Sequence, residues 1–171
     1  MSDCSSNATV TGRTNVGGFC GFTAGGGPFS LTVSGCYAAG SVTGTDHVGG
    51  FCGVNEGTLQ DCFTTSAVTG GTGYIGGFCG WSWNGQILRC YAAGSLDVTP
   101  GIPTAAGFCG VNSDAPNFLG LLEDCFWNTQ TSGTTIAYTN TSGSYGSQAG
   151  VCVGITTAQM PTSTPPAATE A

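Results

Sequence analysis

The feature that most constrains this chain is a short phrase that returns along it. Gly-Gly-Phe-Cys-Gly stands at 17–21, 49–53 and 76–80, and Ala-Gly-Phe-Cys-Gly follows at 106–110. The cysteines of the phrase are 32, 27 and 30 residues apart. Self-similarity at a period of this size is typical of solenoids and repeat arrays, in which each unit buries its apolar face only against its neighbours.

The ten cysteines divide into two sequence columns. The first column lies in the repeated phrase, with Ala-Gly-Val-Cys-Val-Gly as its last variant, and contains Cys20, Cys52, Cys79, Cys109 and Cys152. The second column begins a segment of small residues and contains Cys4, Cys36, Cys62, Cys90 and Cys125. This arrangement predicts one domain over 1–160, with units near 4–35, 36–61, 62–89, 90–124 and 125–160. A Pro/Thr-rich tail or linker follows at 161–171.

Each unit is predicted to be β. Alternate positions of the segment 36–42 are small and mostly apolar, namely Cys36, Ala38, Gly40 and Val42. Period-two alternation of this kind indicates a strand with one buried face. Glycine-rich turns follow each such segment, and no stretch shows an apolar stripe of helical period. We therefore expect an all-β fold, a β-solenoid of about four to five stacked coils spaced about 4.8 Å apart.

The phenylalanine of the repeated phrase breaks this alternation. Strict alternation places Phe19, Phe51, Phe78 and Phe108 on the face opposite the neighbouring cysteines. One interpretation is an external ladder of stacked rings. The one we favour is that the paired glycines bend each strand, so that the phenylalanines also turn inward, because such pairs mark bulges and corners.

The segment 48–70, VGGFCGVNEGTLQDCFTTSAVTG, resembles the GLUG repeat, whose phrase runs approximately Val-Gly-Gly-Leu-Val-Gly, Asn-x-Gly-x-Ile and Asn-Cys-Tyr-Ala-Thr-Gly-Ser-Val. The resemblance extends over nearly all of 3–160, and the stretch 154–160 is similar to the segment that often closes such arrays. It implies a β-solenoid in extracellular or cell-surface proteins of microbes, in which the repeats perform no chemistry. This chain departs from the family by placing cysteine where an aliphatic residue usually follows the Gly-Gly-Leu.

The cysteines of the first column, which the family usually lacks, give each cysteine of the second column a partner. Pairing in chain order gives Cys4–Cys20, Cys36–Cys52, Cys62–Cys79, Cys90–Cys109 and Cys125–Cys152. A rival register that begins at Cys20–Cys36 leaves Cys4 and Cys152 unpaired, and a third interpretation keeps some cysteines free and buried as small hydrophobes. Sequence alone does not fix the connectivity. Disulfides imply an oxidising, extracellular or cell-surface location.

Charge and motif content disfavour several functions. The chain has two arginines, no lysine and a net charge of −7, which argues against a nucleic-acid partner. No apolar run reaches the roughly 20 residues of a membrane span. We find no nucleophile elbow, zinc motif or phosphate loop, so we expect no enzyme, cofactor or metal. His47 is interpreted as a solvated turn residue, and Asp61, Glu123 and Asp124 as turn residues.

Three readings of the function remain, led by an extracellular structural module that stacks head-to-tail as the subunit of a fibre. The second is an adhesin in which Trp81 and Trp83, which alternate on one side of a strand, contact a glycan, a cell surface or another partner. Covering a wider coil is the alternative role for these tryptophans. The third is ice binding through an outward row of Thr9, Thr11, Thr43 and Thr69, broken by Asp97. Asn7 and Asn140 match the pattern for asparagine glycosylation.

Overall fold

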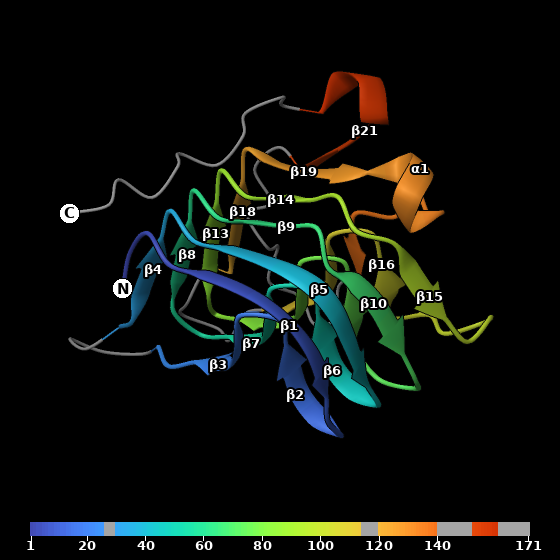
Figure 1. The fold of residues 1–171 in the computed structure, drawn as a ribbon, viewed down its shortest axis with the longest axis horizontal. Helices are drawn as coiled ribbons and strands as arrows, with labels where there is room; N and C mark the ends of the chain where they lie inside the picture. The colour runs from blue at the N-terminus through green and yellow to red at the C-terminus, as the bar shows by residue number, and fades with distance from the viewer. Residues whose placement is uncertain (26–29, 114–119, 140–151, 161–171) are drawn as a thin grey trace.

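The protein winds as a parallel β-solenoid (Figure 1). The computed structural model describes residues 1–25, 30–113, 120–139 and 152–160. Each of the first four coils passes in turn through four sheets, which we name after their first strands as the β1, β2, β3 and β4 sheets. All the strand pairs described are parallel and join one coil to the next. The all-β solenoid predicted from the repeat is therefore confirmed.

The four sheets contain all the described strands. The β1 sheet contains β1 Ser5–Thr11, β5 Tyr37–Gly44, β9 Phe63–Thr64, β10 Ala67–Gly70, β14 Tyr91–Ala92, β15 Leu96–Val98, β19 Cys125–Asn128 and β21 Cys152–Ile155. The β2 sheet contains β2 Thr14–Gly17, β6 Asp46–Gly49, β11 Ile75–Gly76 and β16 Ala105–Ala106. The β3 sheet contains β3 Cys20–Thr23, β7 Cys52–Asn55, β12 Cys79–Trp83, β17 Cys109–Ser113 and β20 Tyr138–Thr139. The β4 sheet contains β4 Thr32–Ser34, β8 Thr58–Gln60, β13 Gln86–Leu88 and β18 Leu121–Glu123.

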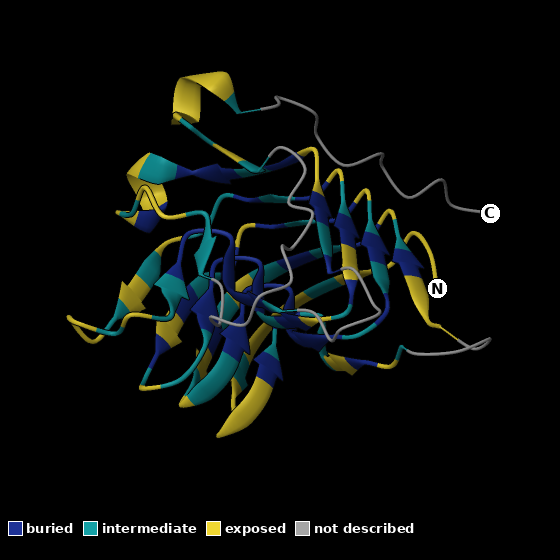
Figure 2. Ribbon diagram, turned by 180° about the vertical axis from the view of Figure 1, so that it is seen from behind, coloured by how far each residue is buried: buried dark blue, intermediate teal, exposed yellow. Residues whose placement is uncertain are grey.

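Equivalent residues lie directly above one another in successive coils. Val42 is in register with Val10 below and with Val68 above, and Val68 is in register with Leu96. Buried residues line the inside of the coils along the whole stack (Figure 2). In-register stacking lets each apolar residue pack on its own counterpart, so the repeat in the sequence becomes a column in the structure.

A line of glycines divides the interior into two apolar clusters. The smaller cluster contains Val16, Val42, Val48, Val68 and Ile75, and the larger contains the phenylalanines, leucines and cysteines. Between them the second glycine of each phrase faces the small residues of the β1 sheet: an ideal Cβ on Gly18 would lie 3.3 Å from the Ala38 Cβ, and one on Gly77 would lie 3.4 Å from the Ala92 Cβ. The small face predicted for the strands thus serves this close approach.

The phenylalanine column faces inward. Phe51, Phe78 and Phe108 are fully buried, and their rings stack on one another at 5.0 Å with interplanar angles of 2° and 7°. Phe19 stacks on Phe51 at 4.8 Å but is only partly buried, because it belongs to the first coil. The inward bend at the paired glycines is therefore confirmed, and the ladder of stacked rings lies inside the solenoid.

A corner of left-handed backbone precedes the β1 sheet in each coil. The residues at this corner have φ values of 52° to 61°, and they are Asp3, Gly35, Asp61, Arg89 and Asp124. Aspartate and glycine tolerate this conformation better than most residues, which explains their recurrence there. Glu123, in contrast, lies in strand β18. At Arg89 the guanidinium bonds both carboxylate oxygens of Asp61 in the coil below, at 2.6 and 2.8 Å.

Two short helices follow the last coils at the C-terminal end. Helix α1, Thr129–Ser132, begins at Asn128, whose side chain accepts bonds from the backbone of Gln130 and Thr131. It ends at Gly133, which has a φ of 68°. The 3₁₀ helix η1, Thr157–Gln159, follows β21. Within the residues described, no helix has the length and apolarity needed to cross a membrane.

The cysteines do not staple the coils in this structure. All ten are free thiols, seven of them buried, so the disulfide-stapled architecture expected from the sequence is not observed. Backbone ladders and stacked apolar columns hold successive coils together, and the buried cysteines pack as small hydrophobic residues. This matches the interpretation in which the cysteines are free. The chain-order pairing remains a prediction about an oxidised form.

Candidate functional site

The outer edge of strand β1 is the first candidate interaction surface. Among the described residues, β5 is the strand that pairs with β1. The amide of Tyr37 donates to Cys4 O at 3.1 Å, and the amide of Gly12 donates to Thr43 O at 3.0 Å. Because the backbone groups of a strand alternate between its two sides, the even-numbered residues of β1 bond to β5. The backbone groups of Ser5, Asn7, Thr9 and Thr11 therefore point to the open edge.

Within the residues that the structure describes, this edge has none of the features that usually protect an edge strand. β1 is seven residues long, and its sequence SSNATVT contains no charged residue and no proline. Natural sheets commonly blunt their edges with lysine, proline, bulges or a covering segment. The glycosylation candidate Asn7 is an exposed residue of this strand, whereas Asn140 lies outside the described residues. The β1 edge is thus available to another strand.

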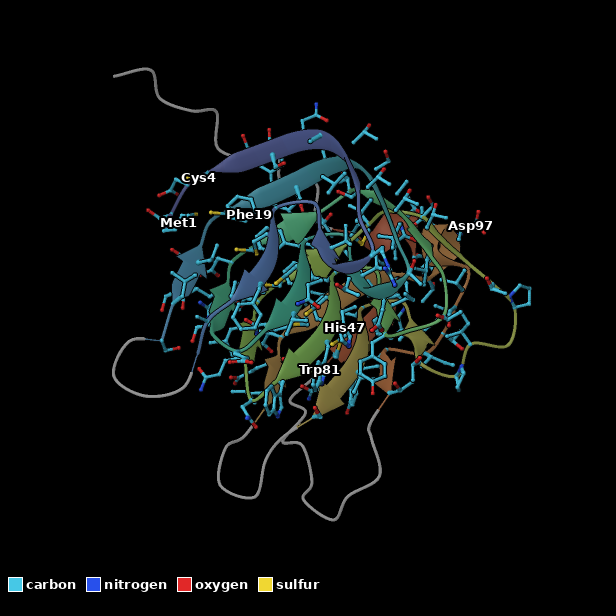
Figure 3. All side chains as sticks on the ribbon, turned by 90° about the horizontal axis from the view of Figure 1, so that it is seen from below. Met1, Cys4, Phe19, His47, Trp81 and Asp97 are labelled. Atoms are coloured by element: carbon cyan, nitrogen blue, oxygen red, sulfur yellow. The ribbon has the colours of Figure 1, made fainter. Side chains whose placement is uncertain are left out.

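The second candidate is an aromatic cluster on the β2 and β3 sheets. The indole rings of Trp81 and Trp83 lie almost parallel, 5.3 Å apart with an interplanar angle of 10°. The imidazole of His47 also stacks on Trp81, with the two rings 5.2 Å apart (Figure 3). The ring of Tyr74 contacts both His47 at 5.1 Å and Trp81 at 5.7 Å. Trp83 ends the row and is 41% exposed, so the cluster presents a flat aromatic face to solvent.

Hydrogen bonds hold two members of this cluster in place. The Trp81 Nε1 donates to the Ser113 Oγ of the next coil at 2.7 Å. The His47 Nδ1 lies 2.9 Å from the Asn15 Oδ1 of the preceding coil. His47 has a left-handed backbone, with a φ of 50°, and its ring is half-buried among aromatic residues. The interpretation of His47 as a solvated turn residue is therefore wrong, because His47 lies in strand β6 and its ring packs against Tyr74 and Trp81.

The tryptophans lie in strand β12 with their rings stacked side by side, as their alternation in the sequence predicts. Trp81 is in register with Val54 below and Val111 above, and Ser82 is in register with Asn55. Trp81 is partly covered by its neighbours, whereas Trp83 remains exposed. Trp81 therefore packs against its neighbours, as expected if it covers a wider coil, whereas Trp83 leaves an aromatic surface exposed to solvent.

The threonine row proposed for ice binding is only partly formed. Thr11, Thr43 and Thr69 are exposed and in register, and Asp97 follows them in the same row. Thr9 lies in the neighbouring row, where its Oγ1 accepts a bond from the Ser41 Oγ at 3.2 Å. The row thus ends at a carboxylate after three threonines.

The cysteines form two stacks, and all of them except the exposed Cys4 belong to the larger apolar cluster or pack against it. The phrase stack contains Cys20, Cys52, Cys79 and Cys109, which are in register along the β3 sheet. The corner stack lies at the left-handed corner and contains Cys4, Cys36, Cys62, Cys90, Cys125 and Cys152. Cys152 therefore belongs with Cys125, its register partner, and its assignment to the first sequence column is wrong.

The pKa values of the stacked thiols are shifted in both directions. Loss of solvation raises the pKa of Cys125 to about 12 and also raises the pKa of Cys79. A hydrogen bond with Cys52, followed by burial, raises the pKa of Cys20. In contrast, hydrogen bonds lower the pKa of Cys52 and Cys62 despite their burial. Thiolates are the reactive form of cysteine, so the thiols whose pKa is raised are poor nucleophiles in the folded protein. In the part of the chain that the structure describes, no cluster of three or more His, Cys, Asp or Glu is arranged to hold a metal ion.

One coil matches a known family. The family model of the GLUG motif matches residues 71–99, which include the aromatic pair Trp81 and Trp83 and the cysteines Cys79 and Cys90. Residues 71–99 are therefore similar to the GLUG motif.

The residues that the GLUG model matches are in register with residues of the neighbouring coils. Ile75 of the motif is in register with Val48 below and Ala105 above, and Cys79 is in register with Cys52 and Cys109. The resemblance seen in the sequence is thus confirmed for this coil, and its neighbours repeat the same geometry. No curated protein and no solved structure matches the chain.

Proposed function

We propose that this GLUG solenoid is a non-catalytic structural module, extracellular or on a cell surface, that assembles with a second copy of itself end to end. The observation that carries the proposal is the open, uncharged edge of β1. A second copy is the partner that this edge fits best, because each coil of the protein already pairs with a near-copy of itself.

The outer strands of the β1 sheet differ at the two ends of the solenoid, and this difference bears on which ends pair. At the C-terminal end, β21 pairs with β19, and the Thr131 Oγ1 of helix α1 donates to Ala93 O at 2.9 Å. On that side β21 is itself the outer strand of the β1 sheet and has four residues, whereas β1 has seven, so the longer edge of β1 favours a pairing of two N-terminal ends over the head-to-tail fibre expected from the sequence. Antiparallel pairing about a two-fold axis through Ala8 places Asn7 opposite Thr9 of the second copy. Both residues direct their backbone groups outward, so such an interface is self-complementary.

Replacing Thr9 by proline tests this interface. Thr9→Pro removes an outward N–H and leaves the bonds between β1 and β5 intact, because those bonds involve the even-numbered residues. Proline at an edge position is a recognised block to strand pairing. Thr9→Val is the matched control, since it keeps the N–H and the β-branched shape. We expect concentration-dependent dimers in sedimentation experiments for the wild type and for Thr9→Val, and monomers for Thr9→Pro.

Other sedimentation results separate the alternatives. Species that grow beyond the dimer as concentration rises indicate head-to-tail stacking in place of the N-terminal pairing. Monomers of the wild type at all accessible concentrations contradict self-assembly altogether.

A glycan-binding adhesin is the second candidate function. The exposed face of Trp83, backed by Trp81 and His47, is a flat aromatic platform of the kind on which sugar rings stack. Trp83→Ala should abolish binding to any glycan that the wild type retains on an array, and Trp83→Phe should preserve part of it. Ice binding is less well supported, because the threonine row ends at Asp97; thermal hysteresis of a solution of the protein is its test.

A further inference from the structure

We infer that, in an oxidising environment, the cysteines of this protein form disulfides along each stack, from one coil to the next. The five bonds are Cys20–Cys52 and Cys79–Cys109 in the phrase stack, and Cys4–Cys36, Cys62–Cys90 and Cys125–Cys152 in the corner stack. Only Cys125–Cys152 is shared with the pairing in chain order. This inference concerns the covalent form of the module and does not depend on its assembly.

The cysteines of the phrase stack lie directly over one another in successive coils. Cys20 is the register partner of Cys52, Cys52 of Cys79, and Cys79 of Cys109. The thiols of Cys52, Cys79 and Cys109 each donate to the carbonyl oxygen two residues further along, at 3.1, 3.4 and 3.2 Å, so these side chains have the same orientation in each coil. Bonds between neighbours in the stack therefore require little movement of the coils.

The backbone spacing also suits bonds between coils. Cys125 lies directly opposite Cys152, and Cys20 lies directly opposite Cys52, as register partners in parallel strands. Neighbouring strands are about 4.8 Å apart, and disulfides form between Cα atoms roughly 4.4–6.8 Å apart. The Cys4 amide lies 3.4 Å from the Cys36 Sγ, and the Cys62 amide lies 3.4 Å from the Cys90 Sγ, which places these corner pairs equally close.

Apart from Cys125–Cys152, chain order joins cysteines of different stacks. Cys4 lies at the left-handed corner that precedes β1, whereas Cys20 begins strand β3 of another sheet. The register partner of Cys20 is Cys52, in the same sheet. Bonds along a stack therefore join neighbouring strands, whereas chain-order bonds would have to join two sheets.

The number of cysteines in each stack makes the pairing complete and unique. In a row where only neighbours bond, every member finds a partner only if the row has an even number of members, and the pairs then begin at the end of the row. The phrase stack has four cysteines and the corner stack has six, because Cys152 joins Cys125. The bond Cys52–Cys79 is excluded on this ground, since it would leave Cys20 and Cys109 without partners.

The chemistry requires a small-molecule disulfide as the oxidant, such as oxidised glutathione. The thiolate of one cysteine attacks the glutathione disulfide, releases one glutathione thiolate and leaves a mixed disulfide on the protein. The neighbouring thiolate then attacks the protein sulfur of that mixed disulfide and releases the second glutathione. Each protein bond thus oxidises two cysteines and reduces one glutathione disulfide to two glutathione thiols, which take up the two cysteine protons. Because the folded thiols are buried, the reaction should proceed while the chain folds.

A pair of double variants distinguishes the two pairings. Each variant is refolded in a buffer of reduced and oxidised glutathione and then denatured, and its free thiols are counted by alkylation and mass spectrometry. With bonds along the stacks, Cys20→Ser/Cys52→Ser loses one complete pair and retains no free thiol. Cys36→Ser/Cys52→Ser breaks two pairs and retains two free thiols, Cys4 and Cys20. Chain-order pairing gives the opposite counts, which would overturn the inference.

Two further measurements keep the test independent of how the variants fold. Cys125→Ser/Cys152→Ser loses a pair that both schemes contain, so it should retain no free thiol and confirms that oxidation went to completion. In the wild type, a non-reducing peptic digest should contain the Cys20 peptide linked to the Cys52 peptide. Recovery of the Cys20 peptide linked to Cys4, or of ten free thiols after refolding with oxidised glutathione, would also overturn the inference.

Discussion

The first and last coils of this solenoid carry the same type of strand but end in different ways. At the N-terminal end, β1 has an open edge and Phe19 is covered on one face by Phe51. At the C-terminal end, Trp127 is 4% exposed and lies at the position that Ala92 occupies in the coil below. Helix α1 and β21 then follow. Within the described residues, the first coil thus presents the long edge of β1, whereas the last coils carry a buried indole, a short helix and the four-residue strand β21, and this difference underlies the proposal that two N-terminal ends meet.

The largest effect on stability should follow from truncating Trp127, the buried aromatic residue near the C-terminal end of the solenoid. Trp127→Ala removes a buried indole whose Nε1 donates to Thr134 O at 3.1 Å, and it should lower the free energy of unfolding by about 4 kcal/mol. Phe19→Ala is the counterpart at the open end and should cost about 2 kcal/mol, because Phe19 is only partly buried. Urea unfolding followed by circular dichroism measures both. Equal costs would show that the two ends are equally well covered.

Replacing a glycine between the two apolar clusters by alanine should have a smaller effect on stability, and the size of the effect should depend on the coil. A Cβ on Gly77 would lie 2.2 Å from the Gly107 oxygen, and one on Gly18 would lie 2.4 Å from the Gly50 oxygen. Gly77 lies between coils that are held on both sides, so Gly77→Ala should lower the free energy of unfolding by about 3 kcal/mol. The first coil has space to shift outward, so Gly18→Ala should cost about 1 kcal/mol. Urea unfolding of the two variants tests this order, and a costlier Gly18→Ala would contradict it.

The smallest effect concerns the cap of helix α1. The Asn128 Oδ1 accepts bonds from the amides of Gln130 at 2.9 Å and Thr131 at 3.2 Å. Asn128→Ala should therefore lower the free energy of unfolding by about 1.5 kcal/mol in urea denaturation. Asn128→Asp keeps the acceptor and loses only the bond from the Asn128 Nδ2 to the Thr157 Oγ1, so it should recover most of the loss. If both variants are equally destabilised, the bond to Thr157, and not the cap, stabilises this end.

The repeat in the sequence predicted the architecture but only part of the detail. The period, the strand pattern and the inward turn of Phe51 follow from local rules, because in-register stacking converts a repeated phrase into columns. The small residues of the strands were predicted, but not that Ala38 approaches Gly18, since this contact joins two sheets. The left-handed corner at Arg89 also went unrecognised, because arginine rarely adopts that conformation and a bond to Asp61 supports it here.

The candidate sites were less predictable than the fold, because they depend on contacts between coils. Trp81 and Trp83 were recognised from their alternation, whereas His47 was misinterpreted because its aromatic neighbours come from later in the chain. Helix α1 is too short to show a helical period, although Asn128 is a favourable cap. The cysteine columns were found by alignment, but Cys152 was placed in the wrong one because its spacing differs from that of the other coils.

The glycine line has a consequence for how such a protein can vary. It separates the valine cluster on one side from the phenylalanine and cysteine cluster on the other, so the two clusters share few neighbours. Changes of side-chain volume in one should combine additively with changes in the other. Substitutions in one cluster can therefore accumulate independently of those in the other. The glycines between the two clusters, in contrast, leave almost no space for a larger side chain.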